Sequence, residues 1–167
     1  MILIGLGANL PTARYGAPRA TLSAALDRLR DLGVAVVRTS PWYDSAPQPP
    51  SGQPRYVNAV VVVETRLRPS ALLQVLHEVE AEFGRHRTVR NAARVIDLDL
   101  LAYRDCVIDT PGLTVPHPRL AQRAFVLLPL ADVAPEWRHP VSGMSVTDLL
   151  AAMPPGQDVR RMSDRHG

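Results

Sequence analysis

The stretch that decides the fold is Tyr56-Val57-Asn58-Ala59-Val60-Val61-Val62-Val63-Glu64-Thr65. It is rich in valine, and β-branched side chains favour strands. The segment before it, residues 45–54, reads Ser-Ala-Pro-Gln-Pro-Pro-Ser-Gly-Gln-Pro, which is too rich in proline for regular structure. We therefore predict a central strand over residues 56–65, which the chain enters from a long loop over residues 45–54.

Helices and strands are expected on both sides of this strand. On its C-terminal side, Pro69 suits the start of a helix over residues 70–83, and Gly84 suits the end of that helix. On its N-terminal side, apolar residues at helical spacing predict a helix over residues 18–32 that stops at Gly33. The remaining expected elements are strands over residues 2–5, 34–39 and 95–103, a small hairpin at residues 107–108, and helices over residues 124–131 and 145–153.

The resulting order is β-α-β-β-α-β followed by a helical tail. This order predicts an α+β fold of the ferredoxin-like kind, in which helices cover one face of an antiparallel sheet. Additional C-terminal helices follow, and we expect residues 1–167 to form a single domain. Because this fold supports many functions, the function must be argued from the site.

Composition narrows the possible chemistry. The chain has 167 residues, a formal net charge of +3 and 19 basic residues, all of which are arginine. The lack of lysine excludes both a phosphate-binding loop of the G-x-x-x-x-G-K-[ST] type and a Schiff-base lysine, so arginine would hold any phosphate. The N-terminus does not resemble a signal peptide and no apolar run approaches a membrane span, so we expect a cytoplasmic protein without a membrane partner.

The most informative segment for function is Ile96-Asp97-Leu98-Asp99-Leu100. Because side chains alternate along a strand, Asp97 and Asp99 share one face, with their Cβ atoms roughly 7 Å apart. Mg²⁺ favours a few carboxylates together with substrate phosphates, and it would relieve the repulsion between the two acids. The pair by itself leaves two interpretations open, a magnesium site and a solvated strand face.

Arginines lead directly into this acidic pair. The preceding segment contains Arg85, Arg87, Arg90 and Arg94, with His86 among them. Arginines on a loop beside a metal site can close over a polyphosphate and neutralise the charge that develops on it. The combination of a magnesium site and arginine clamps indicates phosphoryl-type transfer.

Taken together, these motifs resemble the 6-hydroxymethyl-7,8-dihydropterin pyrophosphokinase family along nearly the whole chain. The matching segments are Gly-Leu-Gly-Ala-Asn-Leu at residues 5–10, Gln-Pro-Arg-Tyr-Val-Asn-Ala at residues 53–59, Glu80 with Gly84-Arg85, Arg-Val-Ile-Asp-Leu-Asp at residues 94–99, Val115-Pro116-His117, and Arg123-Ala124-Phe125. The resemblance implies a ferredoxin-like enzyme of folate biosynthesis that transfers pyrophosphate from ATP to the hydroxymethyl group of the pterin and releases AMP. It implies two Mg²⁺ ions per active site, and we expect a monomer without a nucleic-acid partner.

The resemblance also implies roles for individual residues. Asp97 and Asp99 would hold the metal ions, and Arg85 and Arg94 would be catalytic arginines on a mobile loop. The residues that would bind ATP are His77, Glu80, Leu100, Thr114, His117 and Arg123. The residues that would bind the pterin are Ser45, Tyr56, Asn58 and Phe125, with Phe125 stacked on the ring and Asn58 matched to its polar edge.

The chain departs from the family pattern at three places. Asn91-Ala92-Ala93-Arg94 stands where the family usually has Trp-Gly-Pro-Arg, Ala8 stands where serine is usual, and His77 stands where glutamine is common. We therefore expect the loop to carry no aromatic lid over the pterin. The metal pair is unaffected by these departures.

Two other functions are compatible with parts of this pattern. A Mg²⁺-dependent nucleotidyltransferase would also use paired aspartates but would release pyrophosphate rather than AMP. A ferredoxin-like RNA-binding or ligand-binding module would suit the basic charge. RNA-reading sheets, however, present aromatic side chains from their central strands, and residues 56–64 supply one tyrosine and a run of valines.

Overall fold

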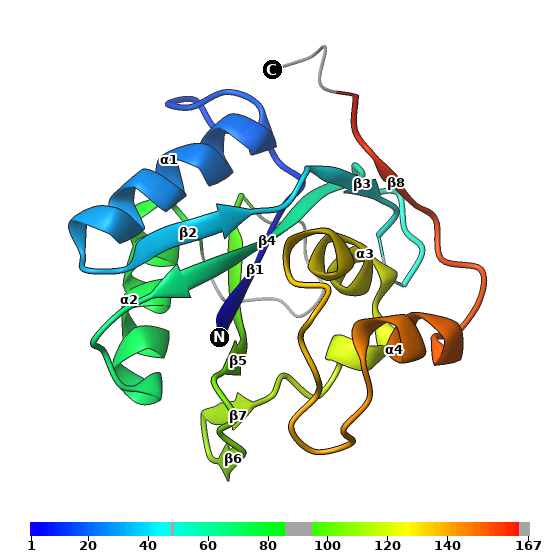
Figure 1. The fold of residues 1–167 in the computed structure, drawn as a ribbon. Helices are drawn as coiled ribbons and strands as arrows, with labels where there is room; N and C mark the ends of the chain where they lie inside the picture. Colours follow the sequence, from blue (N-terminus) through cyan, green and yellow to red (C-terminus); the bar gives the residue numbers. More distant parts are fainter. Residues whose placement is uncertain (48, 86–94, 164–167) are drawn as a thin grey trace.

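The computed structural model of the chain describes residues 1–47, 49–85 and 95–163, and Figure 1 shows their arrangement. The elements in chain order are β1 (Ile2–Ala8), α1 (Pro18–Asp31), β2 (Ala35–Thr39), β3 (Tyr43–Ser45), β4 (Tyr56–Glu64), α2 (Pro69–Glu82), β5 (Asp97–Tyr103), β6 (Ile108–Thr110), β7 (Leu113–Val115), the 3₁₀ turn η1 (Leu120–Gln122), α3 (Ala124–Val133), α4 (Val146–Ala152) and β8 (Val159–Arg161). No helix among these described residues is long and apolar enough to cross a membrane.

The main sheet is antiparallel throughout. Its strand order is β5-β1-β4-β3-β8, and β2 also pairs with β4. Strands β2 and β3 follow one another along the same edge of β4, because β2 pairs with residues 61–64 and β3 with residues 56–58. Strands β6 and β7 form a separate hairpin. The predicted α+β class, the antiparallel sheet and the C-terminal helices are confirmed.

Helices cover both faces of this sheet, whereas the sequence predicted helices on one face. Helices α1 and α2 pack against Ile4, Val61 and Leu98, and the C-terminal helices α3 and α4 belong to a second cluster that contains Leu3 and Val60. Figure 1 shows the two helix pairs on opposite sides of the sheet. The valine run of β4 is apolar on both faces, so each face requires its own helical layer to exclude water.

Three short strands, β3, β7 and β8, were not predicted from the sequence. The small hairpin expected at residues 107–108 is formed by β6 and β7 over residues 108–115. Strand β3 ends at Ser45, so the expected loop over residues 45–54 begins one residue later than predicted. Strand β8 near the C-terminus pairs with β3 and extends the sheet at that edge. The other predicted helices and strands agree with the structure to within a few residues at their ends.

Candidate active site

A row of paired residues crosses the sheet near the C-terminal end of β1. Gly7 pairs with Asp97 of β5 on one side and with Asn58 of β4 on the other, and Asn58 in turn pairs with Tyr43 of β3. Directly opposite residues of antiparallel strands point to the same face. The register therefore brings the acidic strand and the amide of Asn58 to one face, with only a glycine between them.

Gly7 leaves room for both of its neighbours. A Cβ atom at this position would lie 3.1 Å from Asn58 Nδ2 and 4.0 Å from Asp97 Cβ. The requirement for glycine here is one of space, because Gly7 is not among the residues with a positive φ. Because glycine has no side chain, Gly7 leaves open space here and lines a cavity.

This first cavity, which we call the Phe125 cavity, has a volume of about 590 Å³. It lies between the sheet, the proline-rich loop and the start of α3. Its lining residues are Gly7, Ser45, Ala46, Pro47, Pro49, Ser51, Gln53, Tyr56, Asn58, Asp97, Arg119, Gln122, Arg123 and Phe125. The four residues predicted to bind a pterin, Ser45, Tyr56, Asn58 and Phe125, are all among them.

Two contacts fix the polar and aromatic groups of the Phe125 cavity. The hydroxyl group of Ser45 donates a hydrogen bond of 2.5 Å to Asn58 Oδ1, and both residues are buried. This bond determines which end of the Asn58 amide is the oxygen, so the NH₂ group is left to point elsewhere. The guanidinium carbon of Arg123 lies 5.4 Å from the centroid of the Phe125 ring. The cavity therefore combines an aromatic ring, an oriented amide and a cation.

A second, smaller cavity lies on the other side of the acidic strand. We call it the His117 cavity, and its volume is about 270 Å³. Its lining residues are Leu73, His77, Leu98, Asp99, Leu100, Gly112, Leu113, Thr114, His117 and Pro118. Four of the residues predicted to bind ATP, His77, Leu100, Thr114 and His117, are among them.

The acidic pair stands between the two cavities. Asp97 lines the Phe125 cavity, and Asp99 lines the His117 cavity. Burial, together with the negative charge of Asp97, raises the pKa of Asp99 from 3.8 to about 7. Two acids that destabilise each other's charge in this way form a site that favours a cation.

This donor set fits Mg²⁺. No group of three or more histidine, cysteine, aspartate or glutamate side chains with metal-site geometry occurs among the residues with described positions. A pair of carboxylates suits Mg²⁺ nonetheless, because this ion takes its remaining ligands from water and substrate phosphates. It does not suit structural zinc, which takes four protein ligands.

Glu80 and Arg85 form a buried ion pair next to Asp97. The Arg85 guanidinium bonds to Glu80 and donates to Asp97 Oδ1 at 2.7 Å, and its side chain is only 8% exposed. Glu80 also accepts the backbone N–H of Leu98 at 2.9 Å. In this arrangement Arg85 neutralises Asp97, and Glu80 anchors the start of β5. The predicted partner of Arg85, Arg94, lies outside the described residues, as do His86, Arg87, Arg90 and Asn91.

His117 is held as a neutral donor. Its Nδ1 accepts the backbone N–H of Arg119 at 3.1 Å, and the backbone N–H of His117 donates to the carbonyl oxygen of Leu101 at 2.8 Å. Burial, with the charge of Arg123 as the next cause, lowers the pKa of His117 to about 4. The ring therefore carries its proton on Nε2 at neutral pH and can donate one hydrogen bond from there.

The sequence did not predict four polar residues of the Phe125 cavity, Ser51, Gln53, Arg119 and Gln122. Arg119 is exposed, and it lies near enough to His117 for its charge to lower the pKa of that ring. Its position two residues after His117 was the available signal, because a turn that presents one phosphate-binding side chain can present the next. Gln53 begins the segment at residues 53–59 that matches the family pattern, which was its signal, whereas Ser51 and Gln122 have no comparable signal in the sequence.

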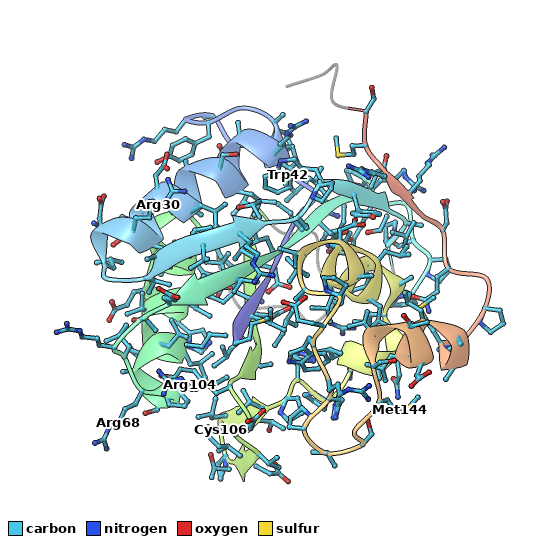
Figure 2. The ribbon with its side chains drawn as sticks, in the orientation of Figure 1. Arg30, Trp42, Arg68, Arg104, Cys106 and Met144 are labelled. Carbon is cyan, nitrogen blue, oxygen red and sulfur yellow. The ribbon has the colours of Figure 1, made fainter. Side chains whose placement is uncertain are left out.

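A larger hollow of about 990 Å³ lies at the opposite end of the strands. Met1, Arg38, Glu64 and Arg104 are among its lining residues, and Arg104 follows the last residue of β5 at the edge of the molecule (Figure 2). Glu64 is the one acidic side chain in its lining as described, whereas the two smaller cavities share an acidic pair. The sites predicted from the sequence thus gather around the smaller cavities.

The chain is similar to known proteins in both sequence and fold. The family model described as 7,8-dihydro-6-hydroxymethylpterin-pyrophosphokinase matches residues 3–135. The chain is 43% identical over 154 residues to the 2-amino-4-hydroxy-6-hydroxymethyldihydropteridine pyrophosphokinase of Pseudomonas aeruginosa, which covers 92% of this chain and 91% of that protein. It is 39% identical over 148 residues to the protein of the same name from Synechocystis sp., which covers 89% of this chain and 73% of that protein.

The fold is also similar to a crystal structure of Plasmodium falciparum HPPK-DHPS with pteroate. The TM-score is 0.72 at 15% sequence identity, and the match covers 90% of this chain. This chain spans 44% of the length of that solved chain.

Proposed function

Because the chain belongs to the 7,8-dihydro-6-hydroxymethylpterin-pyrophosphokinase family, we propose that it transfers pyrophosphate from ATP to the hydroxymethyl group of 6-hydroxymethyl-7,8-dihydropterin in folate biosynthesis. AMP is the other product. The observation that carries this proposal is the placement of Asp97 and Asp99 between two cavities of different chemistry. One cavity suits a flat heterocycle, and the other suits a nucleotide.

The Phe125 cavity is the pterin site. A pterin is a flat ring with donors and acceptors along one edge, so it requires a stacking surface and a fixed amide. Phe125 and Tyr56 supply aromatic surface, and Asn58, oriented by Ser45, supplies the amide. No residue from position 91 is needed for this arrangement, which agrees with the absence of tryptophan there.

The His117 cavity is the nucleoside end of the ATP site. His77, Leu100 and Thr114 line it, and His117 is placed to donate from Nε2 to a phosphate oxygen. Arg123 and Arg119, which line the neighbouring cavity, extend a positive surface from His117 toward the pterin site. A triphosphate chain that follows this surface brings its β-phosphorus close to Asp97 and Asp99.

Asp97 and Asp99 would hold two Mg²⁺ ions, which when bound neutralise the triphosphate and polarise its phosphoryl oxygens. Arg85 donates a hydrogen bond to Asp97 and supplies positive charge beside the acidic pair. Glu80, through Leu98, keeps the acidic strand in register.

The chain contributes position and charge to the transfer. The pterin hydroxyl oxygen forms a bond to the β-phosphorus of ATP as the bond from that phosphorus to the α–β bridging oxygen breaks. The bridging oxygen leaves as part of AMP, and the hydroxyl proton passes to solvent water. The pterin site holds the hydroxyl group in line with the leaving oxygen, since alignment accounts for much of the rate in phosphoryl transfer. Arg85, Arg94, Arg119 and Arg123 supply positive charge near the transferred group.

The alternatives account for less of the site. A nucleotidyltransferase would use the acidic pair, but it would have no use for an aromatic and amide cavity of this shape. An RNA-binding module would require an open sheet face, and α3 and α4 cover the face on which Val60 and Val62 lie.

We propose four further properties of the chain. The split arrangement of β1-α1-β2 and β4-α2-β5 around the order β5-β1-β4-β2 supports the ferredoxin-like topology. Two hydrophobic clusters that share one sheet support a single domain. We also propose that the chain is a monomer and that it works in the cytoplasm.

The assignment is tested by incubating the protein with ATP, Mg²⁺ and 6-hydroxymethyl-7,8-dihydropterin. We expect AMP to form only when the pterin is present. Release of pyrophosphate with transfer of the nucleotidyl group would instead identify a nucleotidyltransferase.

A further inference from the structure

Two consecutive residues near the C-terminus, Gln157 and Asp158, contact two different segments that line the Phe125 cavity. They lie in the segment between α4 and β8, which runs along the outer side of α3 in Figure 1. The family match ends at residue 135, so neither residue is covered by it. We call these two residues the C-terminal strap.

Gln157 holds the wall that carries Arg123 and Phe125. Its Oε1 accepts the backbone N–H of Ala124 at 2.8 Å, and its Nε2 donates to the carbonyl oxygen of Gln122 at 3.0 Å. A single amide thus bonds to the backbone on both sides of Arg123. The same Nε2 donates to the carbonyl oxygen of Pro154 at 3.1 Å, which ties the contact back to the end of α4.

Asp158 holds the wall that carries Ser45 and Tyr56. Its carbonyl oxygen accepts the backbone N–H of Ala46 at 2.9 Å, directly after Ser45. Its carboxylate accepts two hydrogen bonds from Arg55, of 2.6 and 3.2 Å, and Arg55 also bonds to Asp44. Asp44 and Ala46 are the chain neighbours of Ser45, and Arg55 directly precedes Tyr56. These contacts therefore hold the backbone around Ser45 and Tyr56, which both line the Phe125 cavity.

We propose that Gln157 and Asp158 are positioning residues, which set the distance between the aromatic wall and the amide wall of the Phe125 cavity. Since the occupant is a pterin only if the proposed function holds, the ligand part of this inference rests on that function. A stacked heterocycle needs its ring and its amide partner at fixed separation, and two adjacent residues of one chain segment can enforce this more rigidly than two independent loops.

The test replaces Gln157 by methionine, which has a similar length and shape but makes none of the three hydrogen bonds. The matched control is Gln74→Met, on the exposed side of α2. The Kd of 6-hydroxymethylpterin is measured by calorimetry in the presence of a non-hydrolysable ATP analogue. We expect about a tenfold rise for Gln157→Met, which corresponds to about 1.4 kcal/mol, and no change for the control.

A conservative variant and a measurement of backbone hydrogen exchange distinguish a positioning role of Gln157 from a general effect on stability. Gln157→Glu keeps the acceptor for Ala124 and should weaken binding less than Gln157→Met. Hydrogen exchange should accelerate at residues 122–126 in Gln157→Met while residues 70–82 stay unchanged. A lower melting temperature with the same pterin Kd and the same exchange at residues 122–126 would overturn the inference.

The exchange measurement also distinguishes a failure of the proposed function from a failure of the inference about the C-terminal strap. If the wild-type protein does not bind the pterin, the proposed function fails, and the exchange at residues 122–126 still decides whether Gln157 positions that wall. If the wild type binds the pterin and Gln157→Met matches it in both measurements, only the strap inference fails.

Discussion

Replacing Gly7 by alanine would add a methyl group to the row of residues that joins Asp97 to Asn58. The new Cβ atom would lie 3.1 Å from Asn58 Nδ2, which is closer than ordinary van der Waals contact, and 4.0 Å from Asp97 Cβ. The amide of Asn58 would have to move by a few tenths of an ångström. Its bond with Ser45, already 2.5 Å long, leaves little freedom for that movement.

The expected consequence is weaker pterin binding with ATP binding preserved. A displaced amide loses roughly one hydrogen bond to the ring, about 1 kcal/mol, which raises the Kd about fivefold. The Kd of 6-hydroxymethylpterin is measured by calorimetry with a non-hydrolysable ATP analogue present, and the Kd of the analogue is measured alone. The His117 cavity is not lined by Gly7, so the second value should not change.

Gly5→Ala is the matched control on the same strand and the same face. Its Cβ atom would lie 3.3 Å from Leu101 Cδ1, the end of a flexible aliphatic side chain that can move aside. This variant should bind the pterin as the wild type does. Equal weakening by both substitutions would mean that strand distortion is the cause, and a Gly7→Ala variant with wild-type affinity would refute the role of this row.

Three further predictions concern charge and stacking. Arg85→Ala and Arg94→Ala should lower kcat at least tenfold with smaller changes in ATP affinity. The control Arg68→Ala, whose side chain points away from the molecule (Figure 2), should change neither kcat nor ATP affinity. Effects of the first two variants on ATP binding alone would contradict this prediction. Because the folded-state pKa of Asp99 is raised from 3.8 to about 7, protonated Asp99 stabilises the metal-free fold, and that stability should decrease as the pH rises from about 4 to about 7. Mg²⁺ should therefore raise the melting temperature more at pH 8 than at pH 5, and Asp99→Asn should remove this difference; an equal Mg²⁺ effect at both pH values would be inconsistent with a metal at Asp99. Phe125→Ala should weaken pterin binding, with a loss on the order of 1 kcal/mol, and Asn91→Ala should not; comparable losses in the two variants would make position 91 a ligand contact.

The features predicted from the sequence were those that depend on local pattern. The valine run of β4, the helix between Pro69 and Gly84, and the alternation of Asp97 with Asp99 each carry their signal within a few residues. The grouping of Ser45, Tyr56, Asn58 and Phe125 came from the family resemblance, and the register of β3 against β4 supplies the physical reason for it.

The features missed depend on contacts between distant segments. Strands β3 and β8 are three residues long, and Val159 is the only aliphatic residue in the six, so only their pairing with each other and with β4 makes them strands. The sequence did not predict that α3 covers the second face of the sheet. The pattern of α3 shows that this helix is apolar, but it does not show where the helix packs. The contact of Arg85 with Asp97 and the strap residues Gln157 and Asp158 likewise become visible only once the chain is folded.

Pyrophosphate should move as one unit from ATP to the pterin at the acidic pair. The most direct measurement follows label from ATP carrying it at either the β- or the γ-phosphorus, with wild-type protein and with Asp97→Asn. With the wild type, both labels should appear in the pterin product in equal amounts, with unlabelled AMP, and the variant should form almost none of this product. Transfer of the γ-label alone, release of both labels as free pyrophosphate, or near-normal turnover in Asp97→Asn would contradict the account.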